Sequence, residues 1–104
     1  MKDLDASDLD IRKHVNGSDI RFTATQGDHP DLEAELDLKG AGKGRYAATH
    51  TGVPPEMGGR GVGTALFHAM VADARKSGYS VLPVCPFIMA KFDKEPDMRD
   101  VMAA

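Results

Sequence analysis

The clearest pattern in the chain is an unbroken alternation of apolar and charged residues over positions 32–39. The apolar residues are Leu32, Ala34, Leu36 and Leu38, and the charged residues between and after them are Glu33, Glu35, Asp37 and Lys39. A period of two is typical of a β-strand with one buried face and one solvated face. A shorter alternation from Ile20 to Ala24 ends at Gly27-Asp-His-Pro30, which predicts another strand followed by a turn.

A third strand is predicted from Arg45 to Thr51, because glycines at 40, 42 and 44 supply a flexible hairpin loop before it. The three strands are expected to form an antiparallel meander. Residues 1–18 differ from this part, since they contain four aspartates and few apolar residues without a clear period. We therefore expect a flexible acidic leader over residues 1–18 and a single folded domain over residues 19–104.

The apolar spacing becomes helical after Pro54-Pro55. A helix is predicted from Gly61 to Ser77, with Gly78 as its C-terminal cap. Tyr79 to Cys85 is predicted to form a fourth strand. Because a helix connects it to the third strand, this pair is expected to be parallel with a right-handed crossover.

Two short helices are predicted after this strand, at about Phe87–Lys94 and Pro96–Met102. The expected fold class is therefore α/β, with a mixed sheet of about four strands. Pro83 lies inside the fourth strand and has no N–H to donate, so its pairing is expected to be incomplete. If the third and fourth strands begin together and then separate, an extended ligand can pair with the freed backbone. A simple sheet edge at Pro83 is the alternative interpretation.

A glycine-dense loop, Gly58-Gly-Arg-Gly-Val-Gly-Thr64, stands directly before the predicted helix. The first N–H groups of a helix lack intrahelical partners and carry the positive end of the helix dipole, so they bind phosphate well. Arg60 can add a charge-assisted contact to the same anion. A glycine-rich turn that only starts a helix is the alternative.

Composition narrows the function further. The 104 residues suit one domain, and the net charge of −3 gives no broad basic field for nucleic acid. The single cysteine cannot form an intramolecular disulfide, and no apolar N-terminal stretch indicates secretion or a membrane span. The four histidines have no metal-ligand spacing. We expect a cytoplasmic protein without a metal, a nucleic-acid partner or a membrane partner.

The glycine loop, extended to Gly58-Gly-Arg-Gly-Val-Gly-Thr-Ala-Leu66, occurs in the same chain as Val81-Leu-Pro-Val-Cys-Pro-Phe87. Together with Thr49-His50-Thr51 and Pro96-Asp-Met-Arg-Asp100, these segments resemble the small stand-alone members of the GNAT superfamily of N-acetyltransferases. The resemblance covers about residues 20–101. It implies a GNAT-like acyl-CoA N-acyltransferase fold.

The resemblance also implies an acetyl-CoA site. Backbone N–H groups of the glycine loop would hold the pyrophosphate, and the pantetheine arm would run between the separated strands. The superfamily usually has Gln or Arg where this chain has Gly58, so that side-chain contact is missing here. The implied cofactor-binding residues are Gly58, Gly59, Arg60, Gly61, Val62, Gly63 and Thr64.

Two residues are candidates for the chemistry. Cys85, at the end of the fourth strand, could accept the acetyl group or donate a proton to the CoA thiolate. A buried cysteine acting as a small hydrophobe is the alternative. His50 is expected at the end of the third strand, on the face of Tyr46 and Ala48, where it could accept a proton directly or through Cys85. Side by side, His50 and Cys85 would form a nucleophile and base pair. A hydrogen-bonded core histidine is the other interpretation.

These features predict transfer of an acetyl group from acetyl-CoA to an amine of a small molecule or peptide, by a monomer or weak homodimer. A CoA- or acyl-CoA-binding module without turnover is the first alternative, because a short chain leaves little room for an acceptor pocket. A nucleotide-binding or protein-interaction domain that uses the loop for another phosphate is the second. The loop does not end in Gly-Lys-Ser/Thr, so a P-loop NTPase is not expected.

Overall fold

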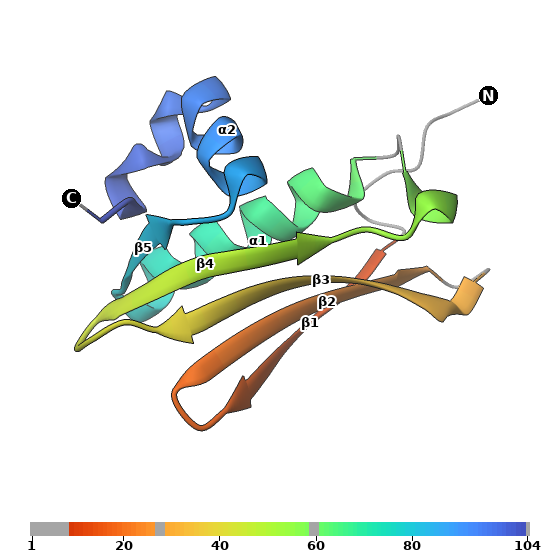
Figure 1. The fold of residues 1–104 in the computed structure, drawn as a ribbon, viewed down its shortest axis with the longest axis horizontal. Helices are drawn as coiled ribbons and strands as arrows, with labels where there is room; N and C mark the ends of the chain where they lie inside the picture. Colours follow the sequence, from red (N-terminus) through yellow and green to blue (C-terminus); the bar gives the residue numbers. More distant parts are fainter. Residues whose placement is uncertain (1–8, 27–28, 59–60, 104) are drawn as a thin grey trace.

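The computed structural model describes residues 9–26, 29–58 and 61–103 of the chain. These residues form a five-stranded sheet in the order β1-β2-β3-β4-β5 (Figure 1). In chain order the elements are β1 (Leu9–Asn16), β2 (Asp19–Gln26), β3 (His29–Gly40), β4 (Arg45–Gly52), the 3-10 helix η2 (Pro55–Met57), α1 (Val62–Ser77), β5 (Ser80–Pro83), α2 (Pro86–Lys94) and the 3-10 helix η3 (Pro96–Val101).

The predicted antiparallel meander is confirmed for β2, β3 and β4. The helical crossover through α1 then brings β5 beside β4, and these two strands pair in parallel, as predicted. β5 is shorter than the predicted strand over residues 79–85, because regular pairing with β4 stops at Pro83. The two predicted C-terminal helices are present, and the second of them is a 3-10 helix.

The prediction of a flexible leader over residues 1–18 is wrong for residues 9–16, which form β1. This strand pairs with β2 along its whole length, from Leu9↔Gln26 to Asn16↔Asp19. β1 is an edge strand whose inward positions are covered only in part: Leu9 and Ile11 pack against the core, whereas Val15 is 67% exposed. An edge strand of this kind needs fewer apolar residues than a central strand, so its pattern is weak. Residues 1–8 lie outside the described residues.

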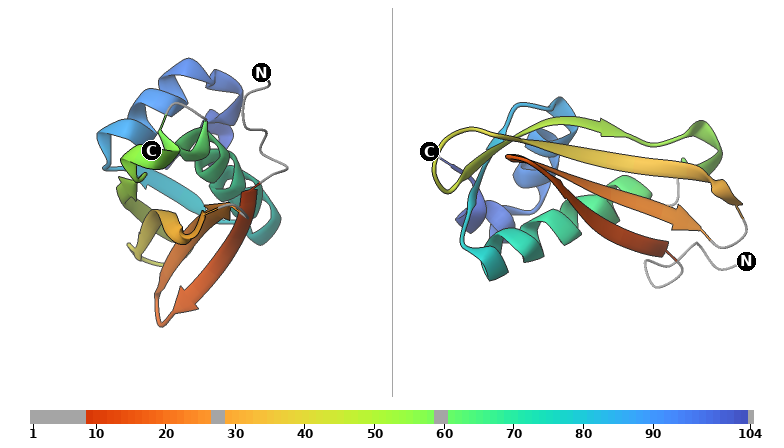
Figure 2. Two further views of the ribbon diagram at one scale, coloured as in Figure 1. Left: turned by 90° about the vertical axis from the view of Figure 1, so that its right-hand side faces the viewer. Right: turned by 90° about the horizontal axis from the view of Figure 1, so that it is seen from below.

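One face of the sheet carries the core and the other carries charged side chains. Apolar side chains of β3 and of the inner side of α1 form this core, and Leu36, Leu38, Leu66 and Met70 are fully buried. α2 and η3 pack beside α1 near the β4–β5 edge, with the rings of Phe67 and Phe92 5.0 Å apart (Figure 2). α1 therefore has neighbours on more than one side, which explains its broad apolar surface.

The ends of α1 follow from glycine conformations. Gly61 at the N-terminal cap has φ 73°, and Gly78 at the C-terminal cap has φ 78°, both in the left-handed region that glycine adopts without strain. The N–H of Gly78 donates to the carbonyl oxygen of Ala74 at 2.8 Å. The helix therefore starts and ends where the sequence predicted, within one residue.

Candidate functional site

β4 and β5 separate part of the way along β4. Their pairing runs from Arg45↔Ser80 to Ala48↔Pro83. Beyond it, the N–H of Val84 turns back to the carbonyl oxygen of Leu82 at 3.0 Å, and the N–H of Cys85 donates to Ala48 at 2.7 Å. The chain then enters α2, so residues 49–52 of β4 have no paired residue on β5. The opening predicted from Pro83 is therefore present, and we call it the β4–β5 opening.

A β-bulge at Thr49 decides which side chains face this opening. Asp37 pairs with His50 and Leu38 pairs with Ala48, so Thr49 is an extra residue in β4. An extra residue reverses the alternation beyond it. Ala48 is buried against the core, and the bulge turns His50 to the opposite, open face. The prediction that His50 shares the face of Ala48 is therefore wrong.

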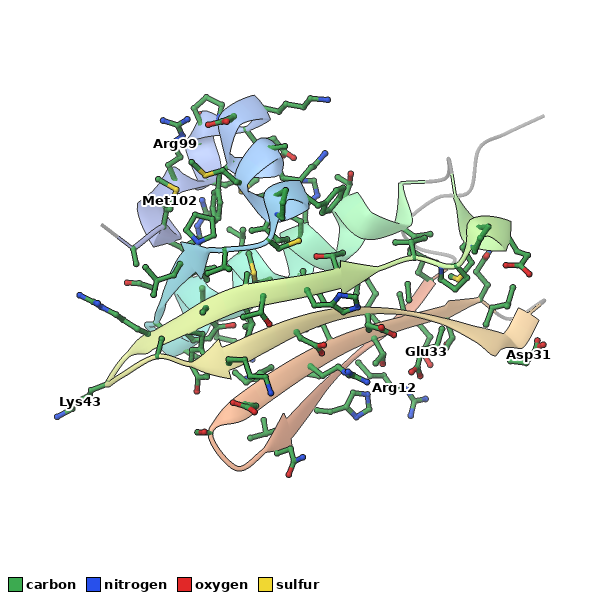
Figure 3. The ribbon with its side chains drawn as sticks, viewed as in Figure 1. Arg12, Asp31, Glu33, Lys43, Arg99 and Met102 are labelled. Carbon is green, nitrogen blue, oxygen red and sulfur yellow. The ribbon has the colours of Figure 1, made fainter. Side chains whose placement is uncertain are left out.

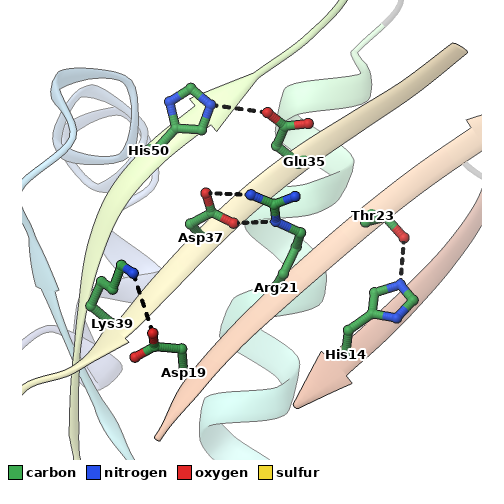
Figure 4. A network of polar contacts seen from close by, with 8 residues as sticks. All are labelled: His14, Asp19, Arg21, Thr23, Glu35, Asp37, Lys39 and His50. Carbon is green, nitrogen blue, oxygen red and sulfur yellow. Dashed lines mark hydrogen bonds and ion pairs between the residues drawn. The ribbon is translucent and has the colours of Figure 1, made fainter. Parts of the chain in front are cut away.

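His50 belongs to a row of polar contacts on the open face of the sheet (Figure 4). Its Nε2 atom lies 3.1 Å from Oε2 of Glu35, and its side chain is 53% exposed. On the same face, the guanidinium of Arg21 donates to both carboxylate oxygens of Asp37, at 2.6 and 3.1 Å. Side chains such as Arg12 and Glu33 extend from this charged face, whereas Arg99 and Met102 lie at the C-terminal helices (Figure 3).

Cys85 lies on the other face, at the N-terminal end of α2. Thr51 pairs with Leu36, which places its side chain on the core face, and the Sγ atom of Cys85 lies 3.6 Å from Oγ1 of Thr51. Cys85 is only 8% exposed. His50 and Cys85 therefore stand on opposite faces of the sheet, and the structure does not bring them together as a pair.

The surroundings of Cys85 change the acidity of its thiol. Burial raises the pKa of Cys85, whereas the N–H of Ile88, the hydroxyl of Thr51 and the N–H of Phe87 lower it, and the result is a pKa below the ordinary value. Backbone N–H groups at the start of a helix favour an anion. The thiol is thus buried, polarised and positioned at the side of the opening.

The glycine loop is held firmly at both ends. Met57 is fully buried, and the N–H of Gly58 donates to the carbonyl oxygen of Pro55 at 3.0 Å. On the other side, Gly61 leads into α1, whose first bond runs from the N–H of Ala65 to Gly61 at 2.9 Å. Gly59 and Arg60 lie outside the described residues, so their predicted contacts are not placed here.

The first turn of α1 is suited to an anion. The N–H groups of Val62, Gly63 and Thr64 precede the first helical bond and have no intrahelical acceptor. No described side chain caps them. A Cβ atom at Gly61 would meet open space, so the left-handed backbone alone selects glycine there. The described part of the predicted loop therefore provides donors for a phosphate group.

The sequence interpretation missed two partners, Glu35 and Thr51. Glu35 lies on the solvated face that the alternation of β3 predicts, but the alternation does not indicate a contact with His50. Only the register across the bulge shows that Glu35 contacts His50 and that Thr51 contacts Cys85. The sequence offers one signal for the contact between Glu35 and His50. Both strands, β3 and β4, carry polar residues at positions that an antiparallel pair can bring together.

Two grooves in the described part of the chain lie away from the β4–β5 opening. One of about 520 Å³ runs between the β3–β4 turn and the C-terminal end of α1, and another of about 390 Å³ lies on the charged face near His14 and Asp19. Among the described residues, no cluster of His, Cys, Asp and Glu is arranged to hold a metal ion. No helix in that part of the chain has the length and apolarity needed to cross a membrane.

Comparison with known proteins identifies the family of the chain. A family model described as GCN5-related N-acetyl-transferase matches residues 21–101. The chain belongs to the GCN5-related N-acetyltransferase family.

A solved structure also resembles the chain. It is the NMR solution structure of "a GCN5-like putative N-acetyltransferase from Staphylococcus aureus", with 30% sequence identity and a TM-score of 0.70. The match covers 94% of this chain and 91% of the other. Comparison with curated protein sequences gives no significant match. The predicted GNAT-like fold is confirmed by this similarity.

Proposed function

We propose that the protein is an N-acetyltransferase that moves an acetyl group from acetyl-CoA to an amine of a small molecule or peptide. The observation that carries this proposal is the position of the β4–β5 opening, with uncapped N–H groups of α1 near one end and the Cys85 thiol at its side. Family membership supports the type of reaction. The acceptor is assigned as an amine because acyl transfer to nitrogen is the reaction that names the family.

The residues at the opening fit two parts of acetyl-CoA, its diphosphate and its pantetheine arm. In this proposal the N–H groups of Val62, Gly63 and Thr64 bind the diphosphate, and Gly58, Gly59, Arg60 and Gly61 complete the loop around it. The backbone of residues 49–52 in β4 has no β5 partner and can pair with the amides of the pantetheine arm. When bound, acetyl-CoA supplies an activated acetyl thioester.

His50 and Cys85 then act from opposite faces. Glu35 accepts the Nε2 proton of His50, which leaves Nδ1 of the ring free to take a proton from the incoming amine. As the new C–N bond forms and the C–S bond breaks, the Cys85 thiol gives its proton to the departing sulfur. Solvent then returns a proton to Cys85 and removes one from His50.

Direct transfer is favoured over an acetyl-cysteine intermediate. The described side chain in contact with Cys85 is the hydroxyl of Thr51, which is not a base. The lowered pKa of Cys85 makes it a more acidic thiol, which can give its proton to the CoA thiolate. His50 is on the other face and is held by Glu35. Cys85 is therefore placed to donate a proton and His50 to accept one, without a proton passing between them.

The test is to incubate the protein with acetyl-CoA and a panel of amines and to measure released thiol. Cys85→Ala and His50→Ala should lower turnover by about 10²-fold or more while CoA binding, measured by calorimetry, stays near the parent value. His14→Ala is the matched control, since His14 lies on the same open face and contacts Thr23 instead. Its turnover should be unchanged.

Other outcomes would replace this proposal. CoA binding without thiol release from any amine would indicate a CoA-binding module. Binding of ATP in preference to CoA would indicate a different phosphate ligand. An acetyl adduct on Cys85 in the intact mass, formed and consumed at the rate of turnover, would overturn direct transfer.

A further inference from the structure

The ring of Phe87 rests directly on the first turn of α1. An ideal Cβ atom built on Gly63 would lie 2.8 Å from Cζ of Phe87 and 3.2 Å from its Cε2 atom. Side-chain carbons do not approach a Cβ that closely, so the ring occupies space that only glycine leaves free. Phe87 as a whole is nevertheless 38% exposed, so its neighbours do not cover it completely.

The backbone of the same residue lies beside the candidate thiol. Phe87 follows Cys85 by two positions, and its N–H is one of the groups that favour the thiolate. Phe87 therefore contacts the surroundings of Cys85 through its backbone and the start of α1 through its side chain. It spans the interval between the proposed diphosphate site and the proposed site of acetyl transfer.

An acyl-CoA must cross this same interval. Its diphosphate binds at one end and its thioester at the other, and the arm between them carries a branched dimethyl segment as well as two amides. The amides can pair with β4, whereas the dimethyl segment needs an apolar contact. Phe87 is a large apolar side chain at the right place that the core does not cover completely.

We propose that Phe87 is a positioning residue for the donor, with its ring packed against the pantetheine arm and its contact with Gly63 fixing Cys85 relative to the first turn of α1. This inference rests on the proposed function. It adds a residue to the donor site that neither the glycine loop nor the candidate catalytic pair contains. Phe87 does not take part in proton transfer.

The absence of tryptophan from the chain provides a direct test. Phe87→Trp places a single tryptophan at the proposed contact, and adding CoA should shift or quench its emission with the same midpoint that calorimetry gives. Met89→Trp is the matched control, because Met89 is on the same helix and 42% exposed, but about 200° further around it. Its emission should not change.

A second measurement separates the arm from the nucleotide. Phe87→Ala should weaken CoA binding about fivefold, whereas Phe87→Leu should restore part of the affinity. Binding of 3′-phosphoadenosine 5′-diphosphate, which contains the diphosphate but no pantetheine arm, should be unchanged in both variants. Circular dichroism and melting confirm that the variants fold.

The outcomes separate the role of Phe87 from the proposed function of the protein. If the emission of Phe87→Trp does not change although the variant binds CoA, the role of Phe87 is overturned and the proposed function stays intact. Equal weakening of both ligands by Phe87→Ala also overturns it, because the ring would then act only through the shape of the loop. A parent protein that binds no CoA refutes the proposed function, and the inference falls with it.

Discussion

The Sγ atom of Cys85 lies 3.6 Å from Oγ1 of Thr51, at the β4–β5 opening. Thr51 belongs to the part of β4 that has no β5 partner, and Cys85 is the N-terminal cap of α2. The contact joins two segments 34 residues apart at the point where regular sheet pairing has ended. It depends on the bulge at Thr49, because without that extra residue Thr51 would face the other way.

Replacing Thr51 by valine should raise the pKa of Cys85, because the hydroxyl is one of the groups that lower it. At a given pH a smaller fraction of the thiol is then ionised, so the pH midpoint of alkylation by iodoacetamide should move upward. Cys85 is the single cysteine of the chain, which makes the measurement unambiguous. Thr49→Val is the control and should leave the midpoint in place. An unchanged midpoint in Thr51→Val would contradict the assignment.

Gly63→Ala and Phe87→Ala should be strongly non-additive. Alanine is favoured over glycine inside a helix by about 1 kcal/mol, but in the parent its Cβ would lie 2.8 Å from the Phe87 ring. Gly63→Ala should therefore raise the free energy of unfolding of the Phe87→Ala variant. In the parent protein the same substitution should leave that free energy unchanged or lower it. Urea unfolding of the four proteins should show a coupling of about 1 kcal/mol or more. Additive effects would show that the ring moves aside freely.

Met57→Ala should destabilise the protein by about 3 kcal/mol, since Met57 is fully buried and its removal leaves a cavity. Because this side chain anchors the chain just before the glycine loop, CoA affinity should fall as well. Urea unfolding and calorimetry measure the two effects. Met89→Ala is the control: Met89 is 42% exposed, and its loss should change stability by less than about 0.5 kcal/mol. Comparable losses in both variants would exclude an anchoring role.

Ionisation of Tyr79 should lower the free energy of unfolding in alkaline solution. Burial and the hydrogen bond of its hydroxyl to Asp73, at 2.7 Å, raise the pKa of Tyr79 in the folded state. In the unfolded chain the group ionises near pH 10, so its contribution is complete below about pH 10 and is lost as the pH rises further. Tyr79→Phe should cost about 1 kcal/mol near neutral pH.

The cost of Tyr79→Phe should diminish above about pH 10. Urea unfolding of parent and variant at neutral and alkaline pH provides the comparison. If both proteins lose stability with the same slope between those conditions, ionisation of Tyr79 is not the cause.

The part of the site that could be predicted is the part that depends on local backbone chemistry. Gly61 and Gly63 needed no tertiary information to indicate a helix start with free N–H groups. Pro83 likewise indicated that β5 would stop pairing. The position of His50 could not be predicted in the same way, because a strand sequence carries no clear mark of a bulge. One extra residue reverses the face of every position that follows.

The amino-acid sequence by itself determined the elements whose periodicity is strong: β3, with its complete alternation, and α1, with glycines at both ends. Only the tertiary structure decided that residues 9–16 join the sheet, since an edge strand is stabilised mainly by its neighbour β2 and not by its own apolar residues. It also decided that Cys85 and His50 stand on opposite faces, and that Phe87 lies on Gly63. These contacts join segments distant in the chain, and their geometry depends on register and packing, which no local pattern encodes.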